Sequence, residues 1–136
     1  MMRRSPNKKV KNATPTIVGG IQFLSKLEAY TYEQLLENNI PCEYAKVRYE
    51  IIKPFVYDNE KVRAMTYKPD FTGDNFVIEC KGHCTDAWKV RVKLIKRRFS
   101  KDYKHLKFYI VSSKKLVDEM IKEIKENVHN NKKNII

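Results

Sequence analysis

Two apolar strand patterns alternate with two amphipathic helix patterns between residues 75 and 128. The segment "NFVIECK" (75–81) has the β-branched and aromatic content of a strand, and "LKFYIVSS" (106–113) has the near-continuous apolar run of a strand buried on both faces. Between them, residues 85–99 follow a helical period that begins after the cap residue Thr85 and places four apolar residues on one face: Trp88, Val92, Ile95 and Phe99. A closing helix over 113–128 turns five apolar residues inward: Val117, Met120, Ile121, Ile124 and Val128. Buried strands between such helices predict a sheet that is covered by helices.

The N-terminal half adds one helix and two further strand patterns. In "SKLEAYTYEQLLENN" (25–39), Ser25 is a favourable N-cap, and an inward stripe is formed by Tyr32, Leu35 and Leu36. One extended pattern covers 43–52, is broken at Lys53–Pro54 and continues in "PFVY", and a second covers 61–67 after the turn "DNE". With 136 residues the chain is expected to form one domain. The predicted fold class is α/β, a mixed β-sheet flanked by helices in the order α-β-β-β-α-β-α.

A glutamate and a lysine share one face of the strand at 75–81. Successive side chains on a strand point to opposite faces, so Phe76, Ile78 and Cys80 lie on one face. Val77, Glu79 and Lys81 lie on the other. Asp70 stands nine positions before Glu79, just past the preceding strand, where a connection can bring it beside the start of the next. Two carboxylates and an ammonium group are therefore predicted to converge at one place.

This combination suits metal-dependent hydrolysis of a phosphate ester. Two close carboxylates repel each other unless a cation lies between them, and hard oxygen ligands suit Mg²⁺ or Mn²⁺. A metal so held lowers the pKa of a bound water and stabilises charge on the phosphate. Lys81 can orient or deprotonate that water, or stabilise the developing charge. The alternative interpretation is a surface ion pair between Glu79 and Lys81, which would contribute at most ~1 kcal/mol.

Glu28 is a further candidate acid, with two competing interpretations. It lies on the inward stripe of the helix at 25–39, in the first turn, where its carboxylate can join the site. It also stands three residues after Ser25, which is the spacing of a capping box. One side chain cannot fill both roles, because reaching back to the amide of its own N-cap directs it away from the sheet.

The charge balance indicates a polyanionic partner. The chain contains 28 Lys and Arg against 16 Asp and Glu, a formal net charge of +12, which favours nucleic acid over a merely solubilising surface. The helix at 85–99 directly follows Lys81, so we interpret its basic residues as contacts to DNA phosphates, with a solvated helix face as the alternative: Lys89, Arg91, Lys93, Lys96, Arg97 and Arg98. Three tyrosines are interpreted as packing residues: Tyr67, Tyr103 and Tyr109.

Cysteine usage points to a reducing compartment. There are three cysteines and no secretory leader is apparent, which favours an intracellular protein. A zinc site is a weaker alternative, because its ligands lack a paired C-x-x-C knuckle: Cys42, Cys80, His83 and Cys84. No run approaches the roughly 18 apolar residues that a membrane-spanning helix needs.

Three stretches together carry a family resemblance. They are "FLSKLEAYTYEQLLENNIPCEY", "YKPDF" and "FVIECKG", in that order. They resemble the PD-(D/E)XK nuclease superfamily, and within it phage endonuclease I, which resolves Holliday junctions. They are also similar to small phage proteins with "G-I-x-F-x-S-x-x-E" and "Y-x-x-D-F", the first of which reads "GIQFLSKLE" here. The resemblance runs from about Thr14 to Ser113.

The resemblance implies a restriction-endonuclease-like fold and a role for each motif residue. Asp70 and Glu79 would be metal ligands, and the backbone carbonyl of Cys80 would add a third. Lys81 would be the motif lysine, and Glu28 the helix acid that completes the catalytic and metal-binding set. The cofactor would be Mg²⁺ or Mn²⁺, the partner branched DNA, and the assembly a homodimer. The chain would divide into a basic flexible arm (1–13), a nuclease domain (14–129) and a frayed tail (130–136).

Three functions remain open from the sequence. The first is a metal-dependent, structure-selective DNA endonuclease that acts on junctions, in the cytoplasm of a bacterium or of a phage-infected host. The second is a nicking or sequence-reading nuclease of the same fold. The third is a DNA-binding module with a vestigial site, which an intact set of Glu28, Asp70, Glu79 and Lys81 disfavours.

Overall fold

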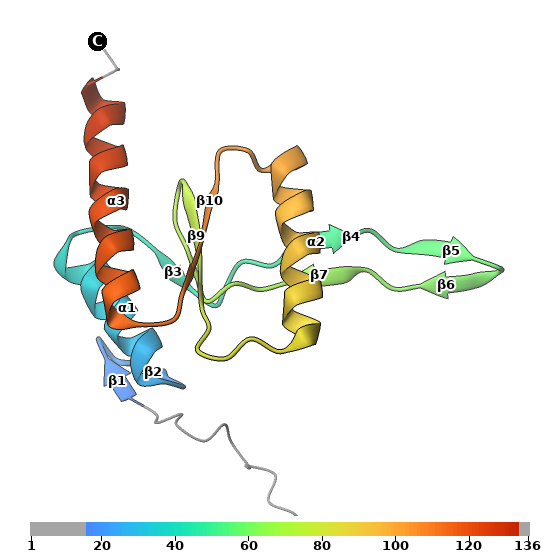
Figure 1. Ribbon diagram of the computed structural model, residues 1–136, viewed down its shortest axis with the longest axis horizontal. Helices are drawn as coiled ribbons and strands as arrows, with labels where there is room; N and C mark the ends of the chain where they lie inside the picture. Colours follow the sequence, from blue (N-terminus) through green and yellow to red (C-terminus); the bar gives the residue numbers. More distant parts are fainter. Residues whose placement is uncertain (1–15, 134–136) are drawn as a thin grey trace, which may run out of the picture.

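The computed structural model describes residues 16–133 and has three layers. A four-stranded sheet in the order β10-β9-β8-β3 lies between helix α2 on one face and helices α1 and α3 on the other (Figure 1). The helices are α1 (Lys26–Glu37), α2 (Asp86–Asp102) and α3 (Lys114–Lys133). The strands of this sheet are β3 (Glu43–Tyr44), β8 (Phe71–Thr72), β9 (Phe76–Cys80) and β10 (Lys107–Val111). The α/β class and the flanking helices are as predicted.

The sheet is mixed in direction. Strand β10 runs parallel to β9, with Lys107 opposite Phe76 and Val111 opposite Cys80. Strand β8 is antiparallel to β9, and β3 is antiparallel to β8. A helical crossover is the usual way to join parallel neighbours, and α2 is the crossover between β9 and β10. Strand β10 ends the sheet, yet helices cover both of its faces, which accounts for its continuous apolar sequence.

Two hydrophobic cores lie on opposite faces of the sheet. On the α1 and α3 side, Phe76, Ile78 and Cys80 of β9 contact buried residues of both helices. On the α2 side, Val77 packs with three apolar residues of the helix: Trp88, Ile95 and Phe99. The predicted alternation of β9 and the predicted buried face of α2 are therefore confirmed.

The first two helices begin where the sequence predicts. Ser25 Oγ accepts a hydrogen bond from Glu28 N (3.1 Å), and Thr85 Oγ1 accepts one from Trp88 N (3.0 Å), so each satisfies an otherwise free helix amide. The prediction that Leu36 and Val128 point inward is wrong. Leu36 is 47% exposed and Val128 is 43% exposed, because each lies at the margin of its helix's apolar face.

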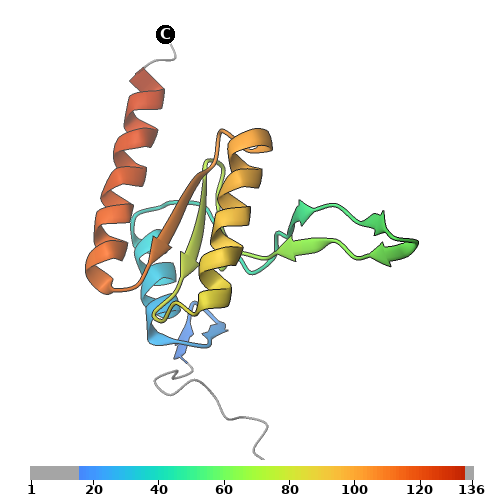
Figure 2. The ribbon, with the colours of Figure 1, turned by 45° about the vertical axis from the view of Figure 1, so that its right-hand side comes forward.

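A long hairpin projects from the body between β3 and β8 (Figures 1 and 2). Its strands are β4 (Tyr49–Ile52), β5 (Phe55–Tyr57), β6 (Glu60–Val62) and β7 (Met65–Tyr67). Asp58 and Asn59 form the tip with φ of 49° and 64°, which both residue types tolerate in hairpin turns. The prediction of one strand over 43–52 is wrong, because Ala45 has φ of 50° and separates β3 from β4.

A second, short hairpin was not predicted. It joins β1 (Thr16–Val18) to β2 (Ile21–Phe23) and turns at Gly19 and Gly20, whose φ values of 57° and 82° suit glycine. The predicted basic arm (1–13) lies outside the described residues, as do 134–136 of the predicted tail. Helix α3 continues to Lys133, four residues into that predicted tail. Between residues 16 and 133, no helix is long and apolar enough to cross a membrane.

Candidate functional site

Asp70 reaches the site because three adjacent segments fix its backbone. Strand β7 ends at Tyr67, and the buried Pro69 brings the chain into β8. Phe71 of β8 pairs with Ile78 of β9, which places the preceding Asp70 alongside the end of β9. Ala45 N donates to Asp70 O (2.8 Å), and Cys80 N donates to Asp70 Oδ2 (2.8 Å). The turn at Ala45 thus helps to hold this carboxylate against β9.

Glu79 and Lys81 extend from the same end of β9. Glu79 is half-buried, and its Oε1 accepts a hydrogen bond from the Tyr67 hydroxyl (2.6 Å). Lys81 Nζ lies 5.0 Å from the centroid of the Trp88 ring, at the start of α2. Glu79 and Lys81 do not form an ion pair with each other in the described part of the chain. The surface ion pair that the sequence left open is therefore not the arrangement observed.

The Glu28 side chain does not complete a capping box. Its backbone amide binds Ser25 Oγ, but its carboxylate Oε1 accepts a hydrogen bond from the Tyr44 hydroxyl (2.7 Å). Tyr44 belongs to β3, so this hydrogen bond directs the Glu28 carboxylate towards the sheet. The negative charge of Glu28 raises the pKa of both Asp70 and Glu79, so it lies within electrostatic reach of both.

Burial and mutual repulsion make these acids hard to ionise together. The pKa of Asp70 rises from 3.8 to about 7, chiefly because the group is buried and next because of the charge on Glu79. Burial is also the main cause of a raised pKa at Glu79. The Lys81 ammonium opposes both shifts. Three acids and one lysine therefore form a locally electronegative site in a strongly basic protein.

The donor chemistry of this site fits a hard divalent cation. Each of the three acids has one carboxylate oxygen bound to a protein donor, and each keeps a second oxygen for a ligand. Within residues 16–133, no group of three or more His, Cys, Asp and Glu side chains is gathered closely enough to enclose a metal. Mg²⁺ does not need such an enclosure, because one or two carboxylates with water and phosphate oxygens usually hold it. Asp70, Glu79 and the Cys80 carbonyl would be its ligands here.

The zinc alternative is less well matched. Cys80 Sγ lies 3.5 Å from the Thr31 hydroxyl on α1, and burial raises the pKa of its thiol. A raised thiol pKa opposes the thiolate that zinc requires. Cys84 is exposed, and Cys42 is half-buried in the core on the α1 and α3 side.

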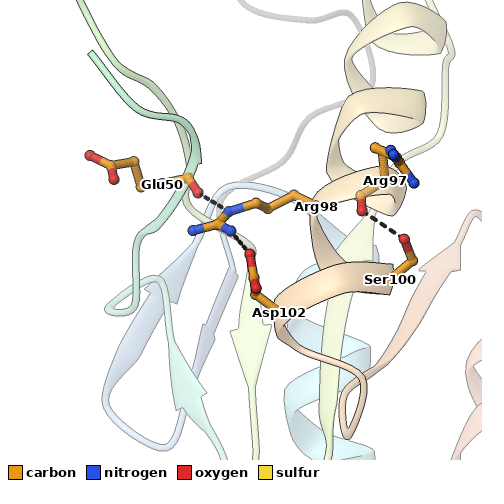
Figure 3. Close-up of polar contacts among 5 residues, drawn as sticks. All are labelled: Glu50, Arg97, Arg98, Ser100 and Asp102. Carbon is orange, nitrogen blue, oxygen red and sulfur yellow. Dashed lines mark hydrogen bonds and ion pairs between the residues drawn. The ribbon is translucent and has the colours of Figure 1, made fainter. Parts of the chain in front are cut away.

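The six basic residues predicted on α2 divide into two groups. Arg91 and Arg98 turn towards the long hairpin and bind its backbone. Arg91 Nη2 donates to Thr66 O (2.5 Å), and its charge partly offsets the rise that burial causes in the pKa of Glu79, so it lies near the acids. Arg98 Nε donates to Glu50 O (2.9 Å) and its guanidinium pairs with Asp102, while the Glu50 carboxylate points away (Figure 3).

The other four residues of this set are exposed on α2: Lys89, Lys93, Lys96 and Arg97. Figure 3 shows the Arg97 side chain directed away from the hairpin that Arg98 binds. Of the six predicted residues, these four therefore remain accessible to an extended polyanion. Arg91 and Arg98 instead hold the hairpin against α2 through hydrogen bonds to its backbone.

Two functional candidates were missed by sequence reasoning. Tyr67 was interpreted as a packing residue, and Tyr44 was not considered, yet each donates a hydrogen bond to a site carboxylate. Tyrosine is ordinary on a buried strand, so residue type alone gives no signal. The available cue was position, because Tyr67 begins the "Y-x-x-D-F" pattern and Tyr44 ends the first of the three resembling stretches.

The comparisons with known proteins add one family match. A profile of the family described as "Protein of unknown function (DUF1064)" matches residues 8–118. Neither the curated proteins nor the solved structures gave a significant match to the chain. The matched range contains all four acidic and basic residues of the site.

Proposed function

The chain belongs to the DUF1064 family, and we propose that it is a metal-dependent DNA endonuclease of the restriction-endonuclease-like, PD-(D/E)XK kind. One observation carries the proposal. Four residues from a helix, a loop and the end of a strand gather so that their charges interact, and they are the four on which the resemblance rests: Glu28, Asp70, Glu79 and Lys81. A vestigial site would have no reason to keep three acids in mutual repulsion.

Each residue of the site would have a separate role in phosphodiester hydrolysis. Mg²⁺ or Mn²⁺, when bound, would supply stabilisation of phosphate charge and a lower pKa for a bound water. Asp70 and Glu79, with the Cys80 carbonyl, would hold the cation, and Glu28 would complete its surroundings. Lys81 Nζ would orient the attacking water, accept its proton or stabilise the developing negative charge. The Trp88 ring at 5.0 Å restrains this ammonium beside the site.

A cleavage assay tests the proposal directly. Linear, forked and four-way DNA of matched sequence would be incubated with the protein and either Mg²⁺ or EDTA. We expect cleavage with Mg²⁺ only, and faster cleavage of the four-way junction than of the linear duplex. Cleavage that continues unchanged in EDTA would contradict the metal-dependent mechanism. Equal cleavage of all three substrates would instead favour the nicking or sequence-reading alternative. The working environment would be the cytoplasm of a bacterium or of an infected host cell.

The basic face of α2 predicts a measurable salt effect. Replacing Lys93 and Arg97 with Gln should weaken DNA binding and reduce the slope of log Kd against log salt by about two, since each lost phosphate contact removes roughly one unit. Fluorescence anisotropy in Ca²⁺, which does not support cleavage in most Mg²⁺ enzymes of this chemistry, would measure binding alone. A matched control replaces Lys115 and Lys122 on α3, which are also exposed but lie across the sheet. An equal loss in both double variants would indicate a general charge effect.

We also propose that the protein acts as a homodimer. A four-way junction needs two cuts, and each chain has one proposed site, so a two-fold pair is the simplest arrangement. Two segments are candidates for the interface: the helix at 25–39 and the extended segment after it. Part of that segment forms the long hairpin, whose outer half exposes three apolar residues: Phe55 (48%), Val56 (66%) and Tyr57 (73%).

The homodimer makes a testable prediction. Light scattering should give about twice the mass of one chain, and the double variant Val56→Ser with Tyr57→Ser should give the monomer mass, because it removes apolar contact area. The monomer is expected to nick junctions without resolving them. A wild-type monomer that cuts both strands symmetrically would reject this arrangement.

A further inference from the structure

Two tyrosine hydroxyls are bound to two carboxylates of the site. Tyr67, on β7, is 3% exposed and donates to Glu79 Oε1 at 2.6 Å. Tyr44, on β3, donates to Glu28 Oε1 at 2.7 Å. Both tyrosines lie within the stretches that carry the resemblance, but neither is one of the four residues to which the resemblance gives a role. The two bonds have the same form, since each occupies one oxygen of a carboxylate and leaves the other available.

Both rings are held firmly by aromatic neighbours. The Tyr67 ring centroid lies 5.9 Å from that of Phe108 and 6.3 Å from that of Trp88, and the Arg91 guanidinium lies 5.9 Å from it. The Tyr44 ring lies 4.6 Å from Phe23 and 5.2 Å from Phe71. A ring packed in this way has few rotamers, so its hydroxyl fixes the position of the oxygen that it binds. The packing of the two cores therefore fixes the positions of Glu79 and Glu28.

We propose that Tyr67 and Tyr44 are positioning residues that set the affinity of the site for its divalent cation, by holding Glu79 and Glu28 with one oxygen of each left for the metal. This inference rests on the proposed function, because it assumes that these acids bind a cation. Asp70 is held in the same manner by Cys80 N. Groups that orient metal ligands affect metal affinity strongly even though they do not touch the metal.

A purely structural role would have a different signature. If the hydroxyls only satisfy buried hydrogen-bonding needs, removing one lowers stability and leaves metal binding unchanged. If they position the acids, metal affinity falls while the fold persists, because phenylalanine keeps the ring and its contacts. Metal affinity and stability therefore have to be measured on the same variants.

The test compares Tyr67→Phe and Tyr44→Phe with a matched control. Tyr109→Phe removes a similar bond, from a tyrosine hydroxyl to Glu123 Oε2 (2.5 Å), on the α3 side and outside the acidic cluster. Calorimetric titration of the full chain with Mn²⁺, without DNA, would give the Kd. We expect Kd to rise about tenfold in Tyr67→Phe and in Tyr44→Phe, and to stay unchanged in Tyr109→Phe. In cleavage assays, the Mn²⁺ concentration for half-maximal rate should rise by the same factor, with kcat at saturating Mn²⁺ nearly unchanged.

The possible outcomes separate the inference from the proposed function. Wild-type Mn²⁺ affinity in both site variants would overturn the inference and leave the nuclease proposal intact. If the variants bind Mn²⁺ more weakly but the wild type does not cut DNA, the inference is supported and the nuclease proposal is rejected. A wild type that binds no Mn²⁺ would overturn both. If Tyr67→Phe does not fold, the Mn²⁺ affinity of Tyr44→Phe alone decides the test. The Tyr44 ring is only half-buried, so its variant is expected to fold.

Discussion

Lys81→Met should lower the rate of DNA cleavage roughly a thousandfold while DNA binding is retained. The lost ammonium is the group that would serve the attacking water, and removing such a group typically slows a reaction by 10²–10⁴-fold. Methionine keeps an apolar stem of similar length against the Trp88 ring, so the start of α2 should stay packed. The measurement is single-turnover cleavage of a four-way junction at saturating Mg²⁺, with binding measured separately in Ca²⁺.

Lys89→Met is the matched control for this experiment. Lys89 lies one residue beyond Trp88 and is exposed, so its variant removes the same charge close to the site without touching the acids. We expect the Lys89 variant to cut at nearly the wild-type rate, with at most a small loss of DNA affinity. Equal loss of cleavage in both variants would mean that local positive charge, and not a role of Lys81 at the scissile bond, sets the rate.

The parts of the fold that were predictable depend on local patterns. The alternation in β9, which puts Glu79 and Lys81 on one face, needs only the geometry of a strand. The caps at Ser25 and Thr85 depend on a side chain and an amide three residues apart. Such signals are contained within one element, so the sequence displays them.

The parts that were not predictable depend on contacts between distant residues. Strands β3 and β8 have two residues each, too short for any period to appear. The break at Ala45 requires positive φ at a residue type that rarely adopts it, and its amide is bound by the Asp70 carbonyl. Arg98 binds Glu50 O across 48 residues of sequence, a contact that only the assembled hairpin explains.

The site, too, depends on both local and distant residues. The four motif residues were identified from charge, spacing and resemblance, but the orientation of their carboxylates depends on donors from other strands. For Glu28 the sequence left two roles open, and only the position of Tyr44 explains why its carboxylate does not bind back to the cap. The consequence of gathering three acids is an electrostatic cost, which can be measured without any substrate.

Asp70→Asn should stabilise the metal-free protein strongly at pH 8 and much less at pH 5. Asn can accept the hydrogen bond from Cys80 N as Asp70 does, so the main change is the loss of a charge. Because the pKa of Asp70 is raised to about 7 in the folded protein, the native state holds a proton that the unfolded chain releases near pH 4. The folded wild type therefore loses stability as pH rises from about 4 to 7, and the loss persists above 7.

The expected size of this effect follows from the pKa difference. A rise of about three units corresponds to at most about 4 kcal/mol, part of which is shared with the charge on Glu79. Urea unfolding in EDTA at pH 5 and pH 8 would measure it, with Asp74→Asn, an exposed acid four residues away, as the control. Mg²⁺ should stabilise the wild type at pH 8 and have little effect on Asp70→Asn, because the cation offsets the same repulsion that the substitution removes. A variant no more stable than the wild type at pH 8 would mean that Asp70 is ionised at little cost, and the electrostatic reason for a cation at this site would be lost.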